Sequence, residues 1–173
     1  MSVKKKAAER SSGEVEADVR ASAQPAAARR AAEAELRGLI DKFAPAHLRL
    51  ITAMRRSLRK RMPAAHEIVY EYKDFFVISF SPSEHGYEGV FAIRASAEEV
   101  KLYFNFGKGL PDPEKLLQGS GQTRWILVEG TSTLARPEVA RLIDDAIARN
   151  RVPFASAGRG SVVIRSTTAT KRR

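Results

Sequence analysis

The stretch LYFNFGKGLPDPEKLLQGSGQTRW, residues 102–125, contains a dense run of turn-forming residues between two segments with the pattern of strands. Apolar Leu102, Phe104 and Phe106 alternate with more polar residues, which is the two-residue period of a strand with one buried face. The prolines that follow cannot continue the ladder, because proline has no backbone N–H. We predict a strand, a rigid turn and a second strand at residues 123–128.

The turn itself has a recognisable order of residues. Asp112 can cap a short helical turn, Pro113 suits its first position, and Gly119 can close it in a left-handed conformation. The sequence therefore predicts a structural role for Asp112, whose removal would loosen the turn.

The flanking segments complete a two-layer α+β sandwich. Leu36, Leu39, Ile40 and Phe43 have the spacing of a helix, Pro45 begins a second helix that extends to about Arg61, and a third begins near Pro137. Between them lie strand patterns joined by short turns, which require antiparallel pairing. We predict an antiparallel sheet of about five strands, with N-terminal and C-terminal helices on one face.

The two ends of the chain have a different composition. Residues 1–32 are rich in Ala, Ser, Lys and Glu, and residues 153–173 combine glycines with a basic end. Such segments bury too little apolar surface to offset the entropy of ordering. We predict a disordered tail at 1–32, one domain at 33–152 and a second disordered basic tail at 153–173.

The string GKGLPDPEKLLQGSGQTRWI, residues 107–126, resembles the YdhG-like domain family of small bacterial proteins, largely of unknown function. The resemblance extends from about Glu33 to about Asn150, although Trp125 replaces a smaller polar residue or histidine. Some members are described as frataxin-like iron chaperones, and the predicted order of elements is similar to that of frataxin. The resemblance thus implies iron as a ligand. Its oxygen ligands would come from the nearest group of carboxylates, Glu67, Glu71, Asp74, Glu84 and Glu88.

The charge distribution indicates another function. Residues 36–65 contain eight Lys and Arg residues and one Asp, whereas frataxin-like proteins have an acidic ridge on the first helix. On the second helix Arg49, Arg56, Arg59 and Lys60 form a basic stripe. It is either a solvated face or a surface for an acidic protein or for nucleic acid, bound without sequence specificity.

A third set of candidates lies around the glycine-rich turn. Lys108 and Arg124 flank glycines whose backbone N–H groups could surround a small anion, unless the glycines serve the turns alone. On the uncovered face of the sheet, Tyr103 could contact a partner or a flat ligand, or could pair with an aromatic residue on the next strand. The other residues that we assign to that face are Glu67, Glu71, Ser79, Arg94, Lys101 and Asn105.

Nothing in the sequence points to a catalytic mechanism. There is no cysteine, and the spacing of His47, His66 and His85 is not that of metal ligands. No segment has the length and apolar character of a membrane span or a signal peptide, so we expect a cytoplasmic protein without membrane contact. We predict a non-enzymatic binding module, either a monomer or a weak homodimer formed through sheet edges.

Overall fold

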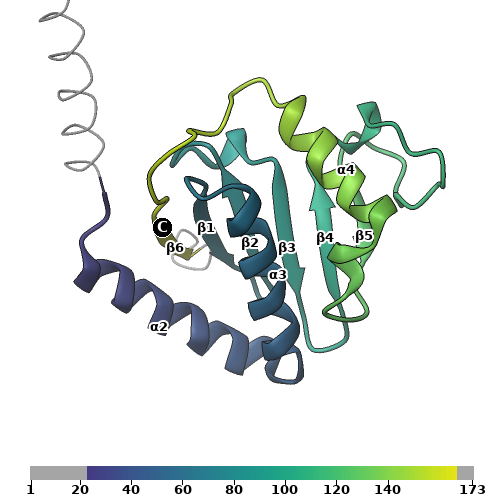
Figure 1. The fold of residues 1–173 in the computed structure, drawn as a ribbon. Helices are drawn as coiled ribbons and strands as arrows, with labels where there is room; N and C mark the ends of the chain where they lie inside the picture. Colours follow the sequence, from purple (N-terminus) through teal and green to yellow (C-terminus); the bar gives the residue numbers. More distant parts are fainter. Residues whose placement is uncertain (1–22, 167–173) are drawn as a thin grey trace, which may run out of the picture.

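The computed structural model describes residues 23–166 of the 173-residue chain, so the predicted disorder of residues 1–22 and 167–173 concerns residues outside this range. The described residues form an α+β fold of three α-helices and one six-stranded sheet (Figure 1). The helices are α2 (Ala26–Phe43), α3 (Leu48–Arg61) and α4 (Pro137–Ala148). The strands are β1 (His66–Glu71), β2 (Phe76–Ser81), β3 (Phe91–Ala95), β4 (Val100–Phe104), β5 (Arg124–Leu127) and β6 (Val162–Ser166). Short 3-10 turns lie at Pro45–His47, Gly86–Glu88, Gly107–Gly109 and Thr133–Ala135.

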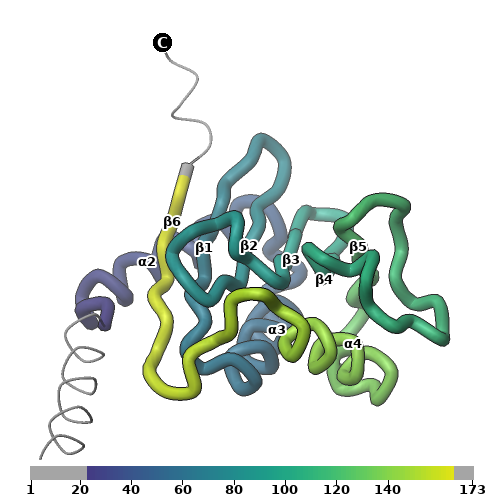
Figure 2. The backbone as a smooth tube through the Cα atoms, turned by 90° about the horizontal axis from the view of Figure 1, so that it is seen from above, coloured from purple at the N-terminus to yellow at the C-terminus, as the bar shows by residue number. Residues whose placement is uncertain are grey.

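The strand order in the sheet is β5-β4-β3-β2-β1-β6. Strands β1 to β5 pair with their sequence neighbours in antiparallel fashion, as the short turns predict, and β6 pairs with β1 in parallel. The view in Figure 2 shows the strands side by side, with β6 at one end and α3 and α4 on the same side of the sheet. The predicted two-layer α+β sandwich is confirmed, but the sheet has one strand more than expected, and the parallel pairing of β6 makes it mixed rather than antiparallel.

Strand β6 corrects the predicted domain boundaries. The prediction of disorder from residue 153 onwards is wrong for Val162–Ser166, and α2 begins at Ala26, before the predicted start at residue 33. The Gln24 side chain binds both backbone polar groups of Val162, at 2.8 and 2.9 Å. At the start of β6, the Ser161 N–H donates to His66 Nδ1 at 3.0 Å, and burial lowers the pKa of His66. His66 therefore has a structural role.

The hydrophobic core lies between the sheet and the helices. The helices contribute the apolar stripes that the sequence predicts, and the strands contribute every second residue. Fully buried side chains of this core include Leu36 of α2, Ile51, Met54 and Leu58 of α3, Phe76, Ile78 and Phe80 of β2, and Phe91 and Ile93 of β3. This packing fixes which face of each strand turns towards the helices.

The register of β1 corrects the predicted faces of two glutamates. Glu67 lies opposite Phe80 and Glu71 lies opposite Phe76, so both side chains are on the helix-covered face rather than on the uncovered one. The alternation of apolar and polar residues in β1 could not show which face is buried, because Ile68 and Val69 lie on opposite faces and are both fully buried. Lys42 at the end of α2 pairs with Glu71 at 2.7 Å.

The opposite face of the sheet has no helix on it in the described part of the chain. By register Ser79, Arg94, Lys101 and Tyr103 lie there, as predicted. The loop at residues 82–90 crosses part of this face: the Asn105 side chain donates to the Gly89 carbonyl at 2.7 Å, and Arg165 of β6 donates to the Glu84 carbonyl at 2.7 Å. The face is therefore partly covered on the β1–β3 side.

The turn after β4 is ordered by Asp112 as predicted, but it is a tight turn at residues 113–114 rather than a short helical turn. The Asp112 carboxylate accepts hydrogen bonds from the backbone N–H groups of Leu116 at 2.9 Å and Leu117 at 2.8 Å. Gly119 has a φ of +102° and no β-carbon, which leaves room for the Trp125 ring against its backbone. The Asp112 hydrogen bonds order the 110–123 loop internally, and the contact between Gly119 and Trp125 holds it against β5.

Replacing Asp112 by alanine is expected to lower the free energy of unfolding by about 1 kcal/mol, because two backbone donors lose their acceptor. Urea unfolding followed by circular dichroism would measure this loss. Asp112→Asn is the matched control, since its amide oxygen still accepts one of the hydrogen bonds. Equal losses in the two variants would contradict a capping role.

Candidate functional site: a basic groove

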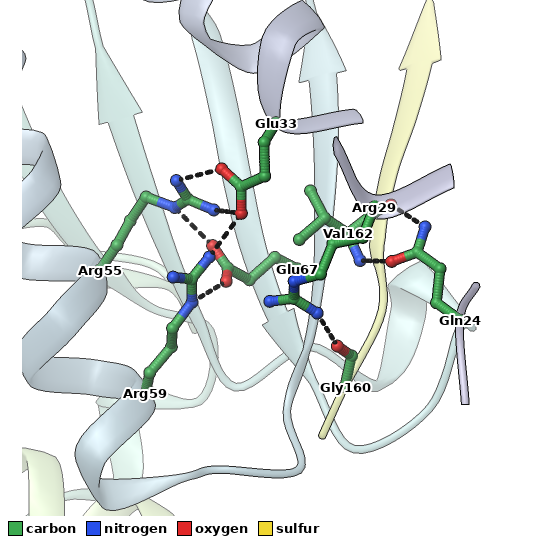
Figure 3. Close-up of polar contacts among 8 residues, drawn as sticks. All are labelled: Gln24, Arg29, Glu33, Arg55, Arg59, Glu67, Gly160 and Val162. Carbon is green, nitrogen blue, oxygen red and sulfur yellow. Dashed lines mark hydrogen bonds and ion pairs between the residues drawn. The ribbon is translucent and has the colours of Figure 1, made fainter. Parts of the chain in front are cut away.

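A groove with a volume of about 790 Å³ opens between the beginning of α2, the end of α3 and the segment before β6. Three parts of the chain line it: residues 23–33, Arg59, and residues 159–160. Its charged lining residues are Arg29, Arg30, Glu33, Arg59 and Arg159. Figure 3 shows the side chains along one part of this groove.

One wall of the groove is a cluster of ion pairs. Arg55 donates two hydrogen bonds of 3.0 Å to Glu33 and one of 2.6 Å to Glu67. Arg59 donates to Glu33 at 2.9 Å and also to Glu67. Glu67 is only 2% exposed, and Figure 3 shows its carboxylate between the two guanidinium groups. Two acidic and two basic side chains meet here, so their formal charges cancel.

The charged side chains of the ion-pair cluster stabilise one another's charged forms. Burial raises the pKa of Glu33, but the hydrogen bond from Arg55 and the charges of Arg55 and Arg59 outweigh it, and the pKa lies below its usual value. Burial lowers the pKa of Arg55, but its contacts with Glu33 and Glu67 outweigh this and raise it. The cluster thus fixes Arg59 in the wall of the groove.

The remaining arginines of the groove lack such compensation. Within residues 23–166, no carboxylate forms an ion pair with Arg29, Arg30 or Arg159. Arg29 Nη1 donates to the Gly160 carbonyl at 2.6 Å, but its Nε is buried and has no hydrogen-bond partner among the described residues. Burial and the charges of Arg159 and Arg59 lower the pKa of Arg29 and outweigh the opposing charges of Glu33 and Glu67. The groove therefore has an excess of positive charge and an unused buried donor.

The arginines of the groove favour an anionic ligand with several oxygen atoms. Guanidinium groups donate in a planar fork that matches the oxygens of phosphate and carboxylate groups. An anion in the groove would relieve the repulsion that Arg159 and Arg59 exert on Arg29.

The structure divides the predicted basic stripe on α3. Arg49, Arg56 and Lys60 are exposed, which fits both a solvated face and a docking surface. Arg59 is not part of that surface, because it lies one turn after Arg55 on the face that meets Glu33 and Glu67. The sequence could not separate the two faces, since both are basic.

The five predicted metal ligands do not form one site. Glu67 is buried between arginines, and Glu71 pairs with Lys42 on the same face of the sheet. Asp74 lies in the β1–β2 turn, Glu84 is in the loop at 82–90, and Glu88 accepts a hydrogen bond from Ser83. Among the described residues, no group of three or more His, Asp or Glu side chains is arranged to hold a metal ion.

Of the predicted ligands near the glycine-rich turn, Tyr103 is separated from the other two, whereas the turn that contains Lys108 packs against Arg124 through Gly107. Arg124 lies opposite Phe104 and so belongs to the helix-covered face, whereas Tyr103 points to the opposite face. Arg124 Nε donates to the Gly121 carbonyl at 2.6 Å, and Lys108 is exposed in its 3-10 turn. Tyr103 packs against Trp125 on the next strand, with ring centroids 5.6 Å apart, which is the structural alternative that the sequence left open.

The groove was missed because its residues lie far apart in the sequence. Arg29 and Arg30 fall inside the predicted N-terminal tail and Arg159 inside the predicted C-terminal tail. The available signal was the position of Arg159 between two glycines, immediately before the apolar run that forms β6.

Comparison of the chain with models of protein families, with curated proteins and with solved structures finds no match in any of the three. The resemblance to the YdhG-like family stays a prediction. Among the helices of residues 23–166, none combines the length and the apolar character that crossing a membrane requires.

Proposed function

We propose that this protein is a non-enzymatic binding module that holds a phosphate-bearing ligand in the basic groove. The observation that carries the proposal is the crowding of Arg29, Arg30 and Arg159 without a carboxylate partner in the described chain, around a buried Nε donor. A negatively charged ligand supplies both the missing charge and the missing acceptor.

The size and the charge of the groove favour phosphate over a single carboxylate. A volume of about 790 Å³ lies within the usual range of small-molecule sites, roughly 300–1,000 Å³. Three arginines without an ion pair among the described residues match a group with more than one negative charge, such as a pyrophosphate. The ion-pair cluster holds Arg59 in place before the ligand arrives, which reduces the ordering cost of binding.

The other predicted functions have less support. Iron binding through the carboxylates finds no common site among the described residues. Binding of nucleic acid or an acidic protein along α3 keeps the exposed Arg49, Arg56 and Lys60, but none of the three lines the groove.

The proposal is tested by calorimetric titration of pyrophosphate, inorganic phosphate and acetate into the full-length protein at low salt. We expect saturable binding of pyrophosphate and none of acetate. Arg30→Ala and Arg159→Ala should each weaken the binding about 10- to 100-fold, the equivalent of one charge-assisted hydrogen bond.

Arg49→Ala is the matched control, because it removes an exposed arginine of α3 outside the groove and should change the affinity less than about twofold. Absence of saturable heat with pyrophosphate would reject the proposal. So would an equal loss of affinity in Arg49→Ala and Arg159→Ala, since that would indicate attraction by net charge alone.

A further inference from the structure

We infer that the uncovered face of the sheet binds single-stranded nucleic acid on a platform of alternating aromatic and cationic side chains. We define the sheet platform as Tyr72, Phe75, Arg94, Lys101, Tyr103 and Trp125. It lies on the face opposite the groove, and the inference does not depend on the groove ligand.

The strand register brings the platform residues together. Arg94 of β3 lies directly opposite Lys101 of β4, and Tyr103 of β4 lies directly opposite Trp125 of β5. Because these positions are two residues apart along β4, all four side chains point to the face without helices. The platform therefore crosses three adjacent strands.

The side chains on the platform form two groups of ring contacts, which meet where Arg94 lies opposite Lys101. Phe75 stacks on Tyr72 with centroids 4.7 Å apart, and the Arg94 guanidinium carbon lies 4.0 Å from the centre of the Phe75 ring. On the next strands Lys101 Nζ lies 5.4 Å from the centre of the Trp125 ring. The two groups together extend from the β1–β2 turn to the edge strand β5.

The positive charges of Arg94 and Lys101 on the platform favour an anionic partner. Like charges directly opposite each other on neighbouring strands are destabilising, and Arg94 and Lys101 form such a pair. Lys101 Nζ forms an ion pair with Glu99 at 2.7 Å. Within residues 23–166 Arg94 has no ion pair, and its guanidinium group lies over the Phe75 ring. The guanidinium group of Arg94 therefore remains a cation without an ion pair among these residues, next to the Phe75 ring.

This combination matches a single strand rather than a duplex or an acidic protein. Unpaired bases stack on aromatic rings and on arginine guanidinium groups, while neighbouring cations attract the phosphates. In a duplex the faces of the bases are stacked on one another and cannot contact the rings, and acidic side chains do not stack on aromatic rings. Open four-stranded sheets with a few such rings stack two or three bases, and the platform has a similar extent.

A further exposed ring lies on the same face. Tyr87, which is 78% exposed, stacks on His85 with centroids 5.4 Å apart in the loop at residues 82–90. Since this loop crosses the uncovered face through Asn105 and Arg165, it lies where a bound strand could extend beyond the platform.

The experiment uses the fluorescence of Trp125, the only tryptophan of the chain. An oligothymidylate of about ten nucleotides, a length within known single-strand site sizes, is titrated into the full-length protein at low salt. We expect saturable quenching. The logarithm of the affinity should fall with the logarithm of the salt concentration with a slope of about −1.4 to −2.1, as for two or three phosphates.

Two platform variants test the stacking. Arg94→Ala and Tyr103→Leu should each weaken the binding about 5- to 100-fold, the usual effect of losing one stacking partner. Leucine keeps apolar contact with Trp125, and circular dichroism checks that both variants fold. The groove variants Arg30→Ala and Arg159→Ala are the matched controls and should bind the oligonucleotide within about twofold of the wild type.

Three results would overturn the inference. They are absence of quenching, equal quenching by heparin or by a duplex of the same length, and unchanged affinity in both platform variants. Because the platform variants should leave pyrophosphate binding intact, failure of this inference and failure of the proposed groove ligand are distinguishable.

Discussion

Replacing Glu67 by glutamine is expected to lower the free energy of unfolding by about 3 kcal/mol, because one partner of a buried ion pair leaves the others uncompensated. The Glu67 carboxylate receives hydrogen bonds from Arg55 at 2.6 Å and from Arg59. The Arg55 side chain is only 11% exposed, so water cannot readily replace the lost charge. Glutamine keeps the shape of the side chain, and the loss therefore reports on charge rather than on packing.

The measurement is urea unfolding of the variant and the wild type at neutral pH. Asp41→Asn is the matched control, since it breaks the exposed Arg37–Asp41 pair and should cost no more than about 0.5 kcal/mol. If Glu67→Gln costs as little as Asp41→Asn, the cluster does not contribute to the stability of the fold.

Replacing Gly160 by alanine is expected to lower the free energy of unfolding by about 3 kcal/mol, the upper range for overpacking at a tight contact. A β-carbon on Gly160 would overlap with the carbonyl group of Ala65 and stand 2.7 Å from the His66 nitrogen. These are backbone atoms, so no side-chain rotation relieves the overlap. The segment must shift, which breaks the 2.8 Å hydrogen bond from the Glu67 N–H to the Ser161 carbonyl.

The matched control is Gly109→Ala, because a β-carbon there has no neighbouring atom within 4 Å. It should change the free energy of unfolding by less than about 1 kcal/mol. Hydrogen exchange adds a local measure: in Gly160→Ala the amides of β6 should exchange faster than those of β3. Equal stability of the two variants would show that the close approach of Gly160 to Ala65 is not needed.

The parts of the fold that sequence reasoning predicts are those set by local patterns. Strand β4, the cap at Asp112 and the apolar faces of the helices follow from two-residue and 3.6-residue periods and from turn chemistry. These features need no knowledge of distant residues. For the same reason Arg94, Lys101 and Tyr103 were assigned to the correct face of the sheet.

The parts that could not be predicted depend on distant partners. The run Val162–Ser166 is too short to indicate a strand until it is paired with β1, which precedes it by 95 residues at the His66–Ser161 contact. Glu67 has a strand pattern compatible with either face, and its position is decided by Arg55 and Arg59 on α3. The groove depends on both the pairing of β6 with β1 and the ion-pair cluster, and local sequence patterns show neither.

The parallel pairing of β6 with β1 also sets an order of assembly. Strands β1 to β4 form by successive local hairpins and β5 joins them after the loop at residues 105–123, whereas β6 must close a loop of some 95 residues, which is entropically costly and slow. The meander is therefore the early structure, and the docking of β6 is a late step on the folding pathway. Because Arg159 and Gly160 line the groove, the groove is completed only in that late step, and a ligand bound there would slow the release of the last strand.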